Sequence, residues 1–195
     1  MDILIAQGGV VTNVAVVADD HDLQDGEYRA ADYPGAGKGH PVIDGAPTPR
    51  PSADHHLVDG AWILDLPLRR ARLLASADGM RDALLAAGFA YDFGDGLGSR
   101  TLDTRNVEDL VNWHGVQATA RSFVSDGVPA TEMDLIDADN AVFAVSAETV
   151  LAALGALTVW RSEIALAARA KKDAIEAAGT EDALAAIDLE TGWPT

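Results

Sequence analysis

The chain has 195 residues, a formal net charge of −17 and no cysteine. So negative a chain is an unfavourable partner for nucleic acid or an anionic membrane, because both are polyanions. Without cysteine there is neither a disulfide framework nor a thiolate metal site, so packing has to hold the fold together. Apolar residues make up 48% of the chain, enough for an ordinary folded core. The acidity also suits solubility in a salty habitat, so it identifies no partner by itself.

The N-terminal part, residues 1–66, is predicted to be a small β-rich module. Residues 3–17 are rich in β-branched side chains around a Gly-Gly pair, which predicts two paired strands or one long bent strand. Prolines and glycines interrupt regular structure from residue 19 to residue 54. The segment LVDGAWILDL that follows predicts a further strand with Asp59-Gly60 as its turn.

Residues 67–88 predict a connecting amphipathic helix. Pro67 suits the first helical position and Gly88 suits the C-terminal cap. Between them, apolar residues recur at alternating spacings of four and three, with Arg70 in one position of the stripe. The stripe consists of Leu66, Leu73, Ala77, Met80, Leu84 and Ala87. Two interpretations remain open: a helix packed on its own domain, or a short oligomeric neck.

Residues 89–195 begin with a predicted β-hairpin and a helix. Three aromatic residues alternate along residues 89–93, and a Gly-rich turn leads into a second strand, RTLDT. We expect Asp103 or Thr104 to cap the following helix. Six residues recur with helical spacing, so one face of that helix is predicted to be buried. They are Leu110, Trp113, Val116, Gln117, Ala120 and Val124.

A second hairpin and two more helices complete the chain. The turn of the hairpin is Asp137–Asn140, in a segment of alternating strand character. Ser146 is expected to cap a long helix that runs to Ala178 and ends at Gly179, and Thr180 to cap a last short helix through Ile187. The most apolar window of the chain lies at the start of the long helix and has a helical period, so we interpret it as a core helix and not as a membrane span.

The predicted fold class is therefore α+β in three parts. Residues 1–66 form the β-rich module with its Pro/Gly-rich loop, and residues 67–88 form the connecting helix. Residues 89–195 form an α+β domain, in which two β-hairpins pack on a long helix and shorter helices.

Several short motifs resemble catalytic or metal-binding signatures but lack essential members. Residues 35–39 lack the first glycine and the hydroxyl residue of a phosphate loop, and residues 92–94 spell the kinase magnesium motif without a catalytic loop. The segment Asp137–Asn140 lacks the glycine and terminal acid of a calcium loop, which favours a self-capped turn. Asp54, His55 and His56 carry metal-ligand groups, but neighbours on an extended segment face opposite sides, so only copies around a symmetry axis would share an ion.

His114, beside Trp113 on the predicted helix, is expected to make one hydrogen bond rather than to take part in acid–base chemistry. No Ser-His-Asp order and no pair of carboxylates stands out in the sequence. We therefore predict no catalytic, cofactor-binding or metal-binding residues, and no enzyme activity.

Several short motifs follow one another along residues 89–195 in a distinctive order. They are Thr101-Leu102-Asp103-Thr104-Arg105, Asp109, Asn112-Trp113, Asp139-Asn140, Lys171-Lys172 and Trp193. In this order they resemble the C-terminal domain of unknown function that many tailed-phage tail-fibre and tail-fibre-assembly-like proteins share. Two positions depart from the pattern: Asp103 stands where glutamine is commoner, and Met133 or Leu135 stands where tryptophan is expected.

The preceding segment, residues 69–93, resembles the helix that often comes before such domains, and the first strands resemble those of small tail proteins. The resemblance implies a location in the phage tail. It offers no catalytic residue that could be transferred to this chain.

On this resemblance we expect a structural component of a bacteriophage tail, a tail-fibre or distal-tip protein that works through protein–protein docking and in host attachment. The expected partners are other tail proteins, further copies of the chain in a trimer or hexamer, and a host surface receptor, without nucleic acid or membrane insertion. The expected location is the virion, after synthesis in the host cytoplasm. An edge strand from residues 3–17 would be available for pairing with a neighbouring subunit.

Three other functions remain open. A tail-fibre assembly chaperone is the main alternative, because it would use the same type of domain. A carbohydrate- or receptor-binding module would need exposed aromatic side chains. The candidates are Tyr28, Tyr33, Trp62 and Trp193. An enzyme has no supporting set of residues.

Overall fold

A Gly-Gly turn folds the N-terminal residues into a hairpin. The computed structural model describes residues 1–94 and 96–194. Strands β1 (Asp2–Gln7) and β2 (Val10–Val16) pair antiparallel, and Gly8 and Gly9 between them have φ of +62° and +80°. A two-residue hairpin turn with positive φ at both positions matches the twist of the strands. The prediction of a strand pair over residues 3–17 is confirmed, and the alternative of one bent strand is wrong.

Short hairpins make up the rest of the first compact unit, residues 1–71. β3 pairs with the other edge of β1, which gives a sheet in the order β2-β1-β3. The predicted turn at Asp59-Gly60 joins the last two strands of the unit. The remaining elements are β3 (Glu27–Arg29), a 3-10 turn η1 (Ala30–Asp32), β4 (Val42–Ile43), β5 (Ala46–Pro47), β6 (His55–Val58) and β7 (Ala61–Leu64).

Helix α1 (Leu66–Ala87) follows the predicted connector closely and ends where Gly88 adopts φ of +86°. Its residues from 72 onward belong to the second compact unit, residues 72–195. Leu73 and Ala77 of the apolar stripe are buried there, and Asp78 forms an ion pair with Lys172. This part of the helix therefore packs on its own domain, whereas an oligomeric neck stays a prediction.

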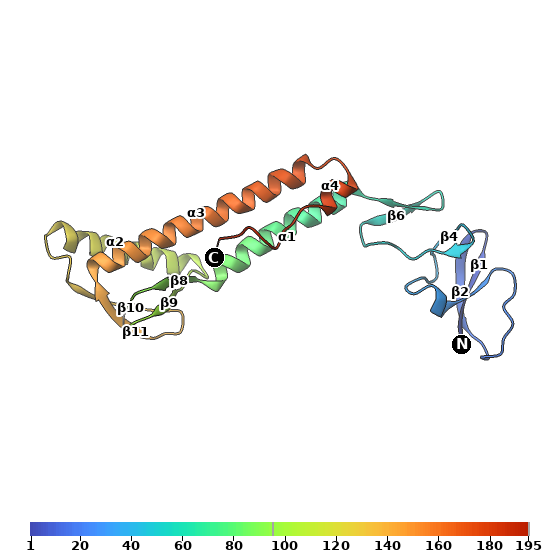
Figure 1. Cartoon of the computed structure of the whole chain (residues 1–195), viewed down its shortest axis with the longest axis horizontal. Helices are drawn as coiled ribbons and strands as arrows, with labels where there is room; N and C mark the ends of the chain where they lie inside the picture. The colour runs from blue at the N-terminus through green and yellow to red at the C-terminus, as the bar shows by residue number, and fades with distance from the viewer. Residues whose placement is uncertain (95, 195) are drawn as a thin grey trace. The chain divides into compact units, whose positions relative to one another are not determined.

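The second unit has the predicted α+β architecture. Figure 1 shows both of its hairpins and α2 gathered at the N-terminal half of α3. The elements are β8 (Phe89–Asp92), β9 (Ser99–Leu102), α2 (Val107–Ser125), β10 (Glu132–Ile136), β11 (Val142–Ser146), α3 (Ala147–Ala177) and α4 (Glu181–Ala185). The α+β fold class is thus confirmed, with all strand pairs antiparallel in the described residues.

The start of α2 differs from the prediction. Its cap is Asn106, not Asp103 or Thr104: Asn106 Oδ1 accepts from the Asp109 N–H at 3.0 Å, and Asp109 Oδ2 accepts from the Asn106 N–H at 3.1 Å. This capping box satisfies two helix-end donors where a single aspartate cap satisfies one. Thr104 makes a different contact: its hydroxyl donates a hydrogen bond to the Leu85 carbonyl of α1.

The other helix caps agree with the sequence. Ser146 caps α3 and Thr180 caps α4, each by accepting a backbone N–H three residues on. The last helix ends at Ala185, two residues before the predicted Ile187.

The main core lies between α3, α2 and the two hairpins. Trp160 of α3 meets the Phe89 ring at 5.3 Å, and Phe93 meets Phe143 at 5.0 Å between the hairpins. By length and mean hydropathy α3 alone among the described helices could cross a bilayer. Nine of its residues are buried inside the protein, however, which favours the interpretation as a core helix.

Gly88→Ala, just after α1, should destabilise the protein, whereas Gly79→Ala, inside α1, should stabilise it. A Cβ at position 88 would lie 2.6 Å from Thr101 Cγ2, and φ there is positive. A Cβ at position 79 would meet nothing within 4 Å, and alanine is preferred to glycine inside a helix by about 1 kcal/mol. Urea unfolding of the two variants should give midpoints on opposite sides of the wild-type value. Midpoints that shift in the same direction would contradict the packing at Gly88.

Candidate functional site

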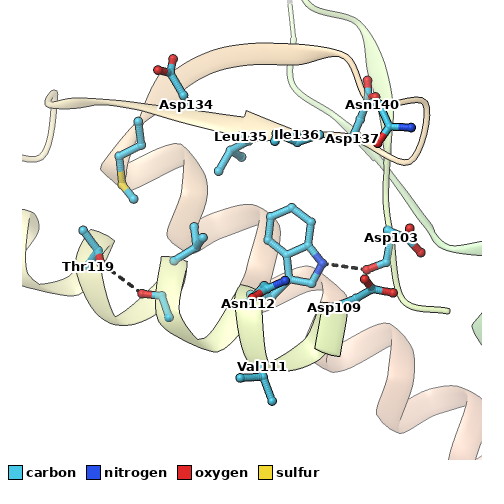
Figure 2. A pocket seen from close by; sticks show the side chains of 14 residues that line it. Asp103, Asp109, Val111, Asn112, Thr119, Asp134, Leu135, Ile136, Asp137 and Asn140 are labelled. Carbon is cyan, nitrogen blue, oxygen red and sulfur yellow. Dashed lines mark hydrogen bonds between the residues drawn. The ribbon is translucent and has the colours of Figure 1, made fainter. Parts of the chain in front are cut away.

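A groove of about 680 Å³ lies between α2 and β10 in the second unit. Figure 2 shows its side chains, which come from α2, from β10 and from the segments on either side. Both apolar and acidic side chains line it, and no residue of β11 does. Groove volumes of this size are typical of binding sites for small molecules or peptide segments.

Trp113 forms the floor of the groove. Its side chain is 8% exposed, and its indole Nε1 donates to the Asp103 carbonyl at 2.7 Å (Figure 2). Because the indole has one donor and no acceptor, this bond fixes the orientation of the ring. The floor of the groove is therefore part of the core.

The turn of the second hairpin closes one end of the groove with Asp137. Its Oδ1 accepts the N–H groups of Asp139 and Ala141 at 3.0 and 2.8 Å, and its Oδ2 accepts from Arg100 at 2.9 Å. The Ala141 N–H above all, followed by the Arg100 guanidinium, holds the pKa of Asp137 below its usual value. Asn140 takes up φ of +61°. The prediction of a self-capped turn at Asp137–Asn140 is confirmed.

Three further carboxylates border the groove, and their surroundings differ. The Asp103 carboxylate accepts from Arg105 Nε at 2.8 Å, and this hydrogen bond lowers the pKa of Asp103. Asp109 is held in the capping box of α2. Asp134 is exposed, and its carboxylate has no hydrogen-bond or ion-pair partner among residues 1–94 and 96–194.

A smaller cavity of about 280 Å³ lies between α2 and α3 and is lined by His114, Gln117 and Arg161. The His114 side chain is exposed and has no hydrogen bond in the described part of the chain, so the expected bond is absent. Arg161 Nη1 is buried there without a hydrogen-bond partner in the described residues. These groups do not form a nucleophile–base pair or any other catalytic arrangement.

The histidine segment of the first unit has structural contacts. His55 is buried, and its Nδ1 lies 2.8 Å from Ser52 Oγ, whereas His56 is exposed on the other side of the strand. Asp54 is buried and forms an ion pair with Arg69 at 3.4 Å. In the described residues, no three side chains of the His, Cys, Asp and Glu types come together in a way that could hold a metal ion.

The four candidate aromatic residues also have partners within the chain. Trp62 Nε1 donates to the Thr48 carbonyl at 3.0 Å, and Tyr28 and Tyr33 meet edge to face at 5.6 Å. Trp193 Nε1 donates to Leu189 at 2.8 Å, and Lys171 lies over its ring. None of the four lines the groove.

The sequence did not predict the groove, although it held a weak signal. Val111 is 61% exposed and Ile136 is 56% exposed, and both line the groove. Val111 lies outside the buried period of its helix, and Ile136 occupies the outer face of a strand whose inner face carries Leu135. Apolar residues on the wrong face of two neighbouring elements are the pattern that would have indicated it.

A family model described as a domain of unknown function, DUF4376, matches residues 68–191, which is more than half of the chain. No curated protein and no solved structure shows significant similarity to the chain.

Asp137→Asn should remove a contribution to stability that is present at neutral pH and lost in acid. The folded state lowers the pKa of this carboxyl, so the stabilisation is fully present above its unfolded value of about 3.9 and is lost as pH falls through the lower folded value. Thermal midpoints of wild type and variant should differ at pH 7 and converge in acid. Asp134→Asn, at an exposed carboxylate without a partner in the described chain, is the control and should leave the midpoint nearly unchanged. If the thermal midpoints of wild type and Asp137→Asn differed by the same amount down to pH 2, the ionised Asp137 carboxylate would not be the source of the stabilisation.

Trp113→Ala should lower the free energy of unfolding by about 3–5 kcal/mol, because it removes a large buried ring and its hydrogen bond. Val111→Ala, on the exposed wall of the same helix, should stay within about 0.5 kcal/mol of wild type. Denaturant unfolding measures both. An unchanged midpoint for Trp113→Ala would mean that the ring is not part of the core.

Proposed function

This chain belongs to the family of the domain of unknown function DUF4376, and we propose that it is a structural component of a bacteriophage tail. In this role it is a tail-fibre or distal-tip protein that docks to other tail proteins, assembles with further copies of itself as a trimer or hexamer, and takes part in host attachment. Its place is the virion, after synthesis in the host cytoplasm.

The observation that carries the proposal is that residues of the tail-type motif make the contacts that connect the elements of the second unit. Leu102 is completely buried, and the carbonyl of the neighbouring Thr101 accepts the Ala138 N–H at 2.8 Å, which ties the first hairpin to the second. Trp113 bonds to Asp103, and Asp109 completes the cap of α2. A match between short motifs and structural contacts supports a shared domain over a chance likeness in composition.

The closing part of the motif has the same character. Lys171 Nζ donates to the carbonyls of Asp188 and Thr191 at 2.9 and 2.7 Å, and lies 5.2 Å from the centre of the Trp193 ring. These contacts hold the C-terminal segment against α3. The motif therefore runs through the second unit from its first hairpin to its end, as a resemblance across a whole domain requires.

Two further features support docking over catalysis. The chain divides into two compact units, which suits a protein that attaches with one module and presents the other. The groove of the second unit combines exposed apolar side chains with carboxylates, and the residues around it have no nucleophile–base arrangement. Enzyme activity is accordingly no part of the proposal.

The first unit offers an open strand edge. In the order β2-β1-β3, β2 is an outer strand, and within residues 1–94 and 96–194 its free edge pairs only at its start, where Val11 bonds to Gly39 and His40. Beyond that point Val16 is 81% exposed. An unpaired edge with exposed apolar residues favours pairing with another subunit.

Quantitative mass spectrometry of purified phage particles tests the proposal, with the copy number normalised to the major tail-tube protein. We expect a copy number that fits three- or six-fold tail symmetry. Absence from the particle, with the protein found in lysates of infected cells, would contradict the structural role and favour the tail-fibre assembly chaperone. A receptor-binding role alone would be indicated if particles without the protein assembled normally but no longer attached to cells.

A further inference from the structure

We propose that the groove between α2 and β10 binds an extended, basic segment of a partner protein, which adds to β10 as a further strand. The inference deepens the proposed docking role and rests on it in one respect, that the chain acts by binding protein. It specifies the surface, the conformation of the bound segment and its charge.

The lining of the groove shows that the groove borders an edge of β10. All four residues from Met133 to Ile136 line it. Successive side chains of a strand point to opposite faces of the sheet, so a cavity lying on one face would contact only every second residue. A cavity that contacts every residue in turn lies along the strand edge. The opposite edge of β10 is paired with β11.

The hairpin register identifies which backbone groups face the groove. At the two ends of the hairpin, the Asp137 N–H donates to Ala141 at 3.1 Å and the Ala147 N–H donates to Thr131 at 2.9 Å. The pairing between them is regular, so Thr131, Met133, Leu135 and Asp137 bond across to β11. The N–H and C=O groups of the alternate residues, Glu132, Asp134 and Ile136, point away from β11 toward the open edge.

The open edge has a defined length. In the described residues β11 is the only strand that pairs with β10. At one end of the edge the Ala138 N–H donates to the Thr101 carbonyl, so β9 closes it there. The five residues of β10 that remain extend over about 17 Å. A segment of about five residues in extended conformation would fill this edge. Its alternating N–H and C=O groups would bond to the open N–H and C=O groups of β10, which favours an extended peptide over a small molecule.

Charge determines the kind of segment. Residues 103–140, which bear the groove, contain eight acidic and two basic residues. The Asp134 carboxylate lies beside the open edge without an ion-pair partner in the described chain, and Asp109 lies at the α2 wall. A lysine- or arginine-bearing segment is therefore attracted to the groove, while an acidic segment is repelled. Ile136, which is 56% exposed, provides an apolar contact for the intervening side chains.

Binding of synthetic peptides to the purified full chain tests the proposal. The probe is a nine-residue peptide of alternating lysine and valine, and its counterpart has glutamate in place of lysine. Calorimetry at low and at physiological salt should show binding of the lysine peptide, weakened by salt, and no binding of the glutamate peptide. Equal binding of both peptides, or binding of neither at millimolar concentration, would overturn the proposal.

Two pairs of variants test the location. Asp134→Lys should weaken binding of the lysine peptide about tenfold, whereas Glu163→Lys, the same charge change at an exposed site on α3, should change it less than about threefold. Ile136→Pro removes an N–H on the open edge and should abolish binding, while Ile136→Ala should retain it. Circular dichroism verifies that each variant is folded. Equal loss for Asp134→Lys and Glu163→Lys would mean unspecific attraction and overturn the site.

Amide hydrogen exchange measured by NMR tests the binding mode itself. Addition of a strand should slow exchange of the Asp134 and Ile136 amides, while the Met133 and Leu135 amides are already protected by β11. Unchanged exchange at Asp134 and Ile136 with peptide bound would overturn strand addition. These results are independent of the particle copy number: a tail protein without this protection keeps its proposed function, and a protected groove in a protein absent from particles keeps its site.

Discussion

The second unit depends on the hydrogen bond from the Trp113 indole to the Asp103 carbonyl. Asp103 directly follows β9, whose Thr101 carbonyl binds the turn of the second hairpin, while Trp113 belongs to α2. One bond thus fixes a strand end against a helix, and its neighbour fixes the same strand against the other hairpin. The two attachments connect both α2 and the second hairpin to the end of β9, and the groove lies between α2 and β10.

The parts of the fold that were predictable are those determined by neighbours in sequence. The Gly8-Gly9 and Asp59-Gly60 turns, and the Ser146 cap of α3, follow from the torsions and hydrogen bonds that these residue types favour locally. The cap of α2 could not be predicted in the same way. Asp103 and Thr104 are also capping residues, but the Asp103 carboxylate accepts from Arg105, and the Thr104 hydroxyl donates to the Leu85 carbonyl near the end of α1.

The groove was beyond sequence reasoning for a similar reason. Whether Ile136 is exposed depends on what lies beside β10, and that is decided by residues more than thirty positions earlier. The residues of the tail-type motif, by contrast, mostly hold the fold together: Leu102 is buried in the core, and Asp109 completes the cap of α2. Val111, Asp134 and Ile136 lie outside that motif, so substitutions in the groove can alter what it binds while these contacts and the fold remain.

The ion pair between Asp78 and Lys172 has a consequence for synthesis of the chain. The two residues are 94 positions apart, so α1 leaves the ribosome long before its partner on α3 exists. Hairpins of the first unit close over short loops and can form at once, whereas the second unit has to wait for its longest helix. Leu73 and Ala77, which are buried in the folded unit, lack that burial until α3 is made. The nascent chain is therefore expected to pass through a stage in which the apolar stripe of α1 is open to chaperones and to other nascent copies.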